Sequence, residues 1–289
     1  MDCQLDIFFL EAILNGLLLA GLLALLALGL NLVFGVIDVV WICYAEVVMV
    51  GMYGINHAYK AGAPFLLAAL IGIVLVAIAG AVLHLLVIRP VLDTPPINQL
   101  LVTGGVLFFL QAAATMGFGI DFRNLGIRLG SVSFFDMNFA MARIITFGVA
   151  LAAMLALWLF LRRTYLGTAI RAIAQDRQIM PLMGVDAKRI YLITSALGGA
   201  LAGLAACLLV LQYDVHPFVG LSFGPITFLI CVLGGLGNFI GGFIAAFVFA
   251  QIISLGGLFS DLEWGYVLAF AFFIVMMFIR PAGLLARRS

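Results

Sequence analysis

Glu46 is the residue of this sequence best placed to do chemistry, because it is an acid within a long apolar run. An ionisable group at bilayer depth costs about 2.5–3.5 kcal/mol on insertion scales, so it normally faces a cavity or a polar partner. Glu46 therefore either lines a water-accessible pathway or hydrogen-bonds an interrupted helix. Trp41 and Tyr44 stand just before it and would offer flat apolar faces to a solute.

Three further polar residues share one face of a later apolar run. Gln99, Thr103 and Gln111 are spaced i, i+4 and i+12, so a helix brings them to one side. This face either binds neighbouring helices or lines a wet path. Asn31, in a glycine-interrupted run, either satisfies freed backbone groups or contacts a solute. The predicted substrate pathway comprises Glu46, Trp41, Tyr44, Asn31, Gln99 and Thr103.

The sequence carries no constellation typical of an enzyme. It has no GxxxxGK[ST] phosphate loop, no HExxH and no GxSxG, and its three histidines are scattered. The four cysteines form no CxxC pair, so neither a metal site nor a disulfide framework is expected. We therefore predict no enzymatic activity and no cofactor, and energy for uphill movement must come from a partner or an ion gradient.

Composition identifies the elements that must position these residues. Hydrophobic residues make up 66% of the 289 and charged residues only 9%, against about 45–50% and about 25% in soluble domains. The net charge of +1 excludes a strongly basic nucleic-acid binder. The chain is predicted to be a single domain, residues 1–289, embedded in a lipid bilayer.

The apolar runs are long and continuous, so they predict an all-α polytopic membrane protein rather than a barrel. The first run exceeds one crossing, which predicts tilt, an interfacial start or a break near Gly29 and Asn31. Two late runs meet at glycines and form either two short spans or a re-entrant pair, giving eight or nine spans. The nine runs lie near residues 8–34, 39–56, 64–88, 97–118, 142–161, 190–212, 222–237, 240–257 and 263–279.

Basic residues set the orientation. Nine alternating spans place ten of the fourteen Lys and Arg on one face, six of them within 162–190. By the positive-inside rule, residues 162–190 and the C-terminus are cytoplasmic and the N-terminus lies outside.

An inverted repeat is also expected. Glycine- and asparagine-interrupted segments at 28–35 (LGLNLVFG) and 233–238 (LGGLGN) would each open one half. Paired interruptions of this kind are typical of a translocation site near the midplane.

Several motifs carry a resemblance to a known family. They are TYLGTAIRAIAQDR at 164–177, MGVD at 183–186, ALGGALAG at 196–203, IRP at 88–90 with TPP at 94–96, VLGGLG at 232–237, and RPAGL at 280–284. Together they closely resemble the permease subunits of branched-chain amino acid ABC importers, the LivH-type family. Where family members usually carry Asn-Phe-Ala-His-Gly-Glu, residues 41–46 read WICYAE, which keeps the acid but has Trp, Tyr and Ala in place of Asn, His and Gly.

The resemblance implies a permease subunit in the bacterial inner membrane that moves a small solute inward. The solute would be a branched-chain or other amino acid, or a related amide or aromatic acid. Implied partners are a second homologous permease subunit, two ATP-binding subunits that hydrolyse ATP, and a periplasmic or extracellular solute-binding protein. The alternative is a self-sufficient secondary transporter with inverted repeats.

The segment 162–190 is predicted to couple the permease to an ATPase. A helix around 171–183 would dock, with Arg171 and Arg177 making polar contacts. Three residues would supply the apolar anchor, namely Ile179, Met180 and Leu182. Gly184 would stop this helix, and Asp186 would cap the next one.

Overall fold

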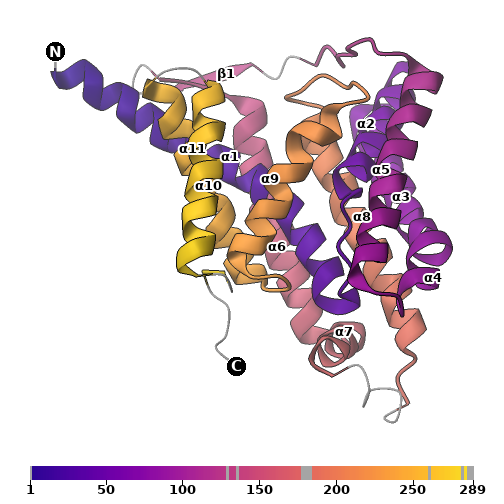
Figure 1. The fold of residues 1–289 in the computed structure, drawn as a ribbon. Helices are drawn as coiled ribbons and strands as arrows, with labels where there is room; N and C mark the ends of the chain where they lie inside the picture. The colour runs from indigo at the N-terminus through magenta and orange to yellow at the C-terminus, as the bar shows by residue number, and fades with distance from the viewer. Residues whose placement is uncertain are drawn as a thin grey trace.

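The computed structural model describes residues 2–127, 130–134, 137–176, 184–259, 262–280 and 283–284. Figure 1 shows long helices that run between two ends of the bundle. The α-helices of eleven or more residues are α1 (Asp2–Ile37), α2 (Tyr44–Lys60), α3 (Phe65–Leu83), α5 (Pro96–Phe118), α6 (Met141–Arg163), α7 (Tyr165–Gln175), α8 (Ala187–Leu209), α9 (Val219–Gly234), α10 (Phe239–Phe259) and α11 (Leu262–Ile279). A π-helix, η1 (His84–Ile88), and α4 (Arg89–Val91) follow α3, and an antiparallel hairpin of β1 (Ser131–Phe134) and β2 (Met137–Ala140) precedes α6.

The prediction of an all-α polytopic membrane protein is confirmed. Within the described residues, six helices are long and apolar enough to cross a membrane, and α9 and α11 are shorter apolar helices. The six correspond to α1, α3, α5, α6, α8 and α10, with α3 extended through η1 and α4. With α2, each of the nine predicted runs contains a helix, and the glycine-rich junction separates α9 from α10.

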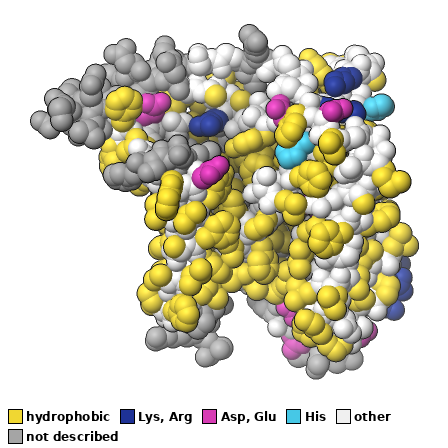
Figure 2. Space-filling view, turned by 45° about the horizontal axis from the view of Figure 1, so that its top comes forward, with side chains coloured by type: hydrophobic (Ala, Val, Ile, Leu, Met, Phe, Trp, Pro, Cys, Tyr) yellow, Lys and Arg dark blue, Asp and Glu magenta, His cyan; other side chains and the backbone are white. Residues whose placement is uncertain are grey.

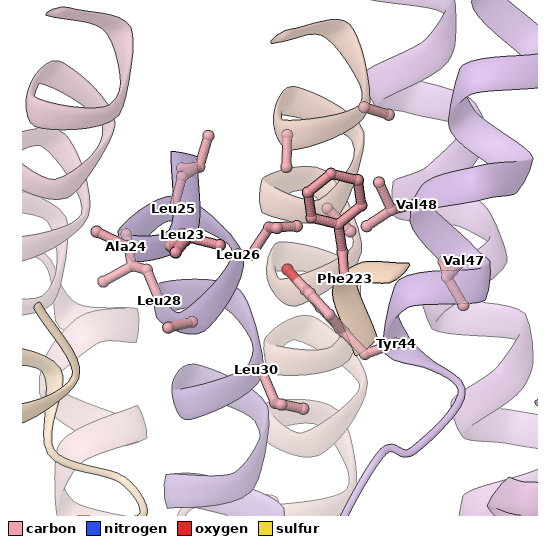
Figure 3. Packing of buried hydrophobic residues seen from close by; sticks show 14 of the residues in the cluster. Leu23, Ala24, Leu25, Leu26, Leu28, Leu30, Tyr44, Val47, Val48 and Phe223 are labelled. Carbon is pink, nitrogen blue, oxygen red and sulfur yellow. The ribbon is translucent and has the colours of Figure 1, made fainter. Parts of the chain in front are cut away.

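α1 is continuous through Gly29 and Asn31, which excludes the break, one of the three alternatives for this long run. Figure 1 shows α1 slanting across the bundle, and this tilt accommodates the excess length. Gly29 instead makes room for a neighbouring side chain, because a Cβ there would overlap the hydroxyl of Tyr44. In Figure 3 the Tyr44 ring reaches from the start of α2 toward α1, beside Phe223 of α9.

The helices pack in a two-fold pattern. α1 packs on α10 as α3 packs on α8, while α2 and α9 pack on each other. Following the chain in Figure 1, α1, α2 and α3 run in the opposite sense to α8, α9 and α10. The expected inversion is therefore present, but the second half begins with α8. The segment 233–238, which was expected to open it, is the link between α9 and α10.

The two ends of the bundle differ in charge. The upper end in Figure 1 holds the β1–β2 hairpin and the connections 119–127 and 210–218. The lower end holds α7, the end of α6 and the start of α8, which contain the basic residues Arg162, Arg163, Arg171, Lys188 and Arg189. The basic segment and the end of α11 thus lie at the same end of the molecule.

Candidate functional site

A cavity of about 330 Å³ lies where the starts of α2 and α9 meet α5. Three of the predicted pathway residues, Trp41, Tyr44 and Glu46, line it. The remaining lining residues are mostly apolar: Leu30, Ile42, Ala45, Leu100, Leu107, Gly220, Leu221, Gly224, Pro225, Thr227 and Phe228. The cavity is thus mostly apolar, with a single acidic side chain among its lining residues.

The Glu46 carboxylate is buried and only half satisfied. The side chain is 1% exposed. Its Oε1 accepts a 2.9 Å hydrogen bond from Nε2 of Gln111 on α5. Its Oε2 has no hydrogen-bond partner among the residues that the structure describes. An oxygen of this kind retains full capacity to accept a hydrogen bond from a solute.

Two helix starts converge on this carboxylate. Glu46 lies in the first turn of α2. Gly220 lies in the first turn of α9, and a Cβ at that position would overlap the carboxylate group of Glu46. Helix N-termini carry partial positive charge, so both helices reduce the free-energy cost of an anion here. This effect offsets part of the penalty for burying the carboxylate.

The two aromatic residues bring further polar atoms to the same region. Trp41 and Tyr44 are almost completely buried. Within the described part of the chain, neither the Trp41 indole N–H nor the Tyr44 hydroxyl has a hydrogen-bond partner. Such buried groups are uncommon in native structures and call for an explanation, such as a bound ligand or water.

Gln99 and Thr103 do not line this cavity. The Gln99 side-chain amide donates to the carbonyls of Val91, Leu92 and Thr94 at 3.1–3.2 Å. The Thr103 hydroxyl lies 3.1 Å from the carbonyl oxygen of Val40, in the non-helical link 38–43 between α1 and α2. Both residues therefore hold chain segments in place around the site.

Asn31 also lies outside the cavity lining. Its Oδ1 accepts a 3.2 Å hydrogen bond from the backbone N–H of Gly237. Gly35 approaches the same turn, since a Cβ on it would lie 2.9 Å from the Gly237 Cα. Asn31 thus fastens α1 to the link between α9 and α10.

Two contributors to the site were absent from the predicted set. Gln111 shares a sequence face with Thr103, but the sequence does not show that its amide meets Glu46. The α9 wall, including Gly220 and Phe228, reads in sequence as an ordinary apolar span. Pro225 inside α9 was a usable signal, because proline cannot donate the helical hydrogen bond to residue 221.

A second cavity of about 560 Å³ lies nearer the upper end, lined in part by Phe122, Tyr213, Asp214 and His216. It shares Leu221 and Pro225 with the first cavity. Figure 2 shows a largely hydrophobic hollow between the two sides of the molecule, with acidic and histidine side chains near its rim. Burial lowers the pKa of His216, and Asp214 opposes this with a smaller effect.

The lower end holds the predicted coupling segment. Its helix, α7, spans Tyr165–Gln175, so the helix expected around 171–183 begins earlier than predicted and does not continue past Gln175, while residues 177–183 lie outside the described residues. The Thr164 side chain caps α7 by accepting the Gly167 N–H at 2.9 Å, which sets the earlier start. At the other end Asp176 adopts an extended backbone (φ −149°, ψ 110°).

Arg171 on α7 is exposed, while Ile170 and Ile173 are buried. Gly184 has φ +79°. Asp186 caps α8 by accepting the Lys188 N–H at 3.0 Å, as predicted. Arg177, predicted to make a polar contact, and the predicted anchor residues Ile179, Met180 and Leu182 lie outside the described residues.

No group of three or more His, Cys, Asp or Glu side chains that could hold a metal occurs within the described residues. The site can offer one carboxylate, two helix N-termini and aromatic faces. This arrangement suits binding of a small polar or amphipathic molecule.

Comparisons with known proteins agree with this picture. A family model described as branched-chain amino acid transport system / permease component matches residues 12–277. The high-affinity branched-chain amino acid transport system permease protein LivH of Salmonella typhimurium is 28% identical over 97% of this chain and 96% of its own length. The BraD permease protein of the same system in Pseudomonas aeruginosa is 29% identical over 96% of each.

A solved structure shares the fold. PsaBC from Streptococcus pneumoniae, in complex with a Fab, superposes with a TM-score of 0.54 at 14% identity, covering 93% of this chain and 91% of that one. Because the family model spans nearly the whole sequence, the chain belongs to the family of permease components of branched-chain amino acid transport systems.

Proposed function

We propose that this chain is the membrane-spanning permease subunit of an ABC importer, driven by ATP hydrolysis on partner subunits. The solute is a branched-chain or other amino acid, or a related amide or aromatic acid. The observation that carries the proposal is the cavity at the meeting point of α2, α5 and α9. Its apolar wall contains one buried carboxylate with an unpartnered oxygen.

The solute pathway runs through this cavity. Trp41, Tyr44 and Glu46 contact the solute, whereas Asn31, Gln99 and Thr103 position the segments around it. The outer cavity lies beside the first and shares Leu221 and Pro225 with it. It receives the solute from a soluble binding protein, and a second permease subunit completes the pathway.

The polar segment 162–190 is the docking surface for the ATP-binding subunits. α7 supports this role because it buries one face against its own bundle and leaves Arg171 exposed on the other. With this end cytoplasmic, a single cysteine replacing Ala174 on α7 resists a membrane-impermeant thiol reagent in intact cells. A cysteine replacing Asp121, at the opposite end, is labelled. The reverse pattern contradicts this orientation.

ATP-driven uptake tests the function. The permease is reconstituted with its candidate ATP-binding subunits, partner permease and binding protein, and uptake of labelled L-leucine is measured with and without ATP. Uptake that depends on ATP supports the proposal. The inverted packing of α1–α3 and α8–α10 also occurs in secondary transporters. Uptake by the permease alone under an ion gradient would therefore favour that alternative and contradict the proposal.

A further inference from the structure

Glu46 has an unpartnered carboxylate oxygen in a cavity wall that is otherwise mostly apolar. Its Oε2 is buried and unpartnered within the described residues, while Oε1 is held by Gln111. An exposed ion pair, Arg189 with Asp186, lies at the start of α8, at the lower end of the bundle. A buried carboxylate without a cation is costly unless a partner arrives.

Two helix starts reduce the free-energy cost of ionising this carboxylate before a solute binds. The first turns of α2 and α9 meet at the carboxylate, through Glu46 itself and through Gly220. Two helix N-termini thereby supply partial positive charge without filling the position that a cation would take. Gly220 is required for this approach, because any side chain there would displace the carboxylate.

The remaining wall suits an amphipathic amine. Trp41, Tyr44 and Phe228 present aromatic rings, which attract ammonium groups as well as apolar surface. Pro225 lacks the N–H that the Leu221 carbonyl would accept in a regular helix, which leaves an additional acceptor beside the cavity. A volume of about 330 Å³ lies at the small end of ligand sites.

We infer that Glu46 is a specificity-determining residue that binds the ammonium group of the solute through Oε2. Within the wider range of solutes given above, the site selects those with a protonated amine over amides and acids that lack one. This inference rests on the proposed function and narrows its substrate class.

Binding to the assembled complex in lipid nanodiscs, without the soluble binding protein, tests the inference by ligand-observed NMR. The probes are L-leucine, 3-methylbutylamine, and 2-hydroxy-4-methylpentanoate, which has a hydroxyl in place of the amine. The wild type is expected to bind the two amines and to bind the hydroxy acid at least about tenfold more weakly.

The key variant is Glu46→Gln, which keeps the side-chain volume and an oxygen that can accept from Gln111. It should lose about tenfold or more in affinity for both amines. The matched control is Glu263→Gln, at an exposed glutamate in the first turn of α11, and it should bind like the wild type. Size-exclusion chromatography verifies that both variants assemble.

Two outcomes would overturn the inference: a Glu46→Gln complex that binds L-leucine like the wild type, or a wild type that binds the hydroxy acid equally well. Either result leaves ATP-driven uptake intact if the proposed function is right. Conversely, the binding assay could show the expected amine selectivity while uptake proves independent of ATP. That combination would reject only the proposed function.

Discussion

Gln111 on α5 donates a 2.9 Å hydrogen bond to Oε1 of Glu46 on α2, joining two helices across 65 residues of sequence. This bond fixes the orientation of the carboxylate in the cavity wall. It also leaves the second oxygen available, since one amide N–H occupies only one of the two oxygens.

Replacing Gln111 by Leu should therefore destabilise the protein by about 1–3 kcal/mol, because both carboxylate oxygens are then buried without a partner. The measurement is the thermal unfolding midpoint of the purified complex. Thr115→Val on the same helix is the control, since the Thr115 hydroxyl bonds only to the Gln111 carbonyl of its own helix among described groups. Equal midpoints for the two variants would contradict the assigned role of Gln111.

Tyr44 and Gly29 form a second pair that can be tested. A Cβ on Gly29 would overlap the Tyr44 hydroxyl, so Gly29→Ala should cost about 1–3 kcal/mol through overpacking. Tyr44→Phe removes the hydroxyl and should restore part of that loss in the double variant. Gly104→Ala, at a helical glycine with nothing within 4 Å, is the matched control. A double variant that shows simple additivity would mean that the two residues are not coupled.

The sequence predicted the helices well because each span is an uninterrupted apolar run, and bilayer thickness sets a minimum length. It predicted less well how neighbouring helices use small residues. Gly29 was read as a break in α1, although its missing side chain serves packing against Tyr44. Long-range packing decides such cases, and the local pattern carries no record of it.

The central residue of the site could also be predicted from the physics of the bilayer. Glu46 stood out because an acid inside an apolar run needs a partner. Gln99 and Thr103 satisfy backbone carbonyls instead of lining the cavity. Nothing in the local sequence distinguishes them from Gln111, because all three share one helical face. The helix of the coupling segment was predicted to begin near Arg171, whereas the Thr164 cap sets the start of α7 six residues earlier, at Tyr165.

Gly184 takes a left-handed backbone with φ +79°, and no described residue beyond its chain neighbours lies within 4 Å of a Cβ built on it. Gly184→Val should cost about 1–2 kcal/mol through backbone strain alone. Gly184→Asn should be milder, since asparagine visits this conformation routinely. We expect ATP hydrolysis to be uncoupled from uptake in the valine variant, measured as ATP hydrolysed for each solute imported. A ratio in the valine variant equal to that of the wild type would show that this turn does not transmit force.

Lowering the pH should destabilise the folded protein through protonation of His216. Burial lowers its pKa in the folded state, so the unfolded state binds the proton first as pH falls through about 6.5. The stability associated with neutral His216 is complete above that pH and is lost below it. The drop in unfolding midpoint between about pH 7.5 and about pH 5.5 should thus be smaller in His216→Gln than in the wild type. An identical or larger drop in the variant would contradict this.

The central claim, that solute crosses through the cavity between α2, α5 and α9, is tested most directly by filling that cavity. Leu107 lines it from α5, whereas Leu101 on the same helix is 69% exposed and is absent from the lining. ATP-dependent uptake of labelled L-leucine is measured for Leu107→Trp and Leu101→Trp in reconstituted complexes with equal subunit content. Leu107→Trp should lower the uptake rate by about tenfold or more, and Leu101→Trp should leave it near the wild-type rate. Wild-type uptake by the Leu107→Trp complex would contradict it.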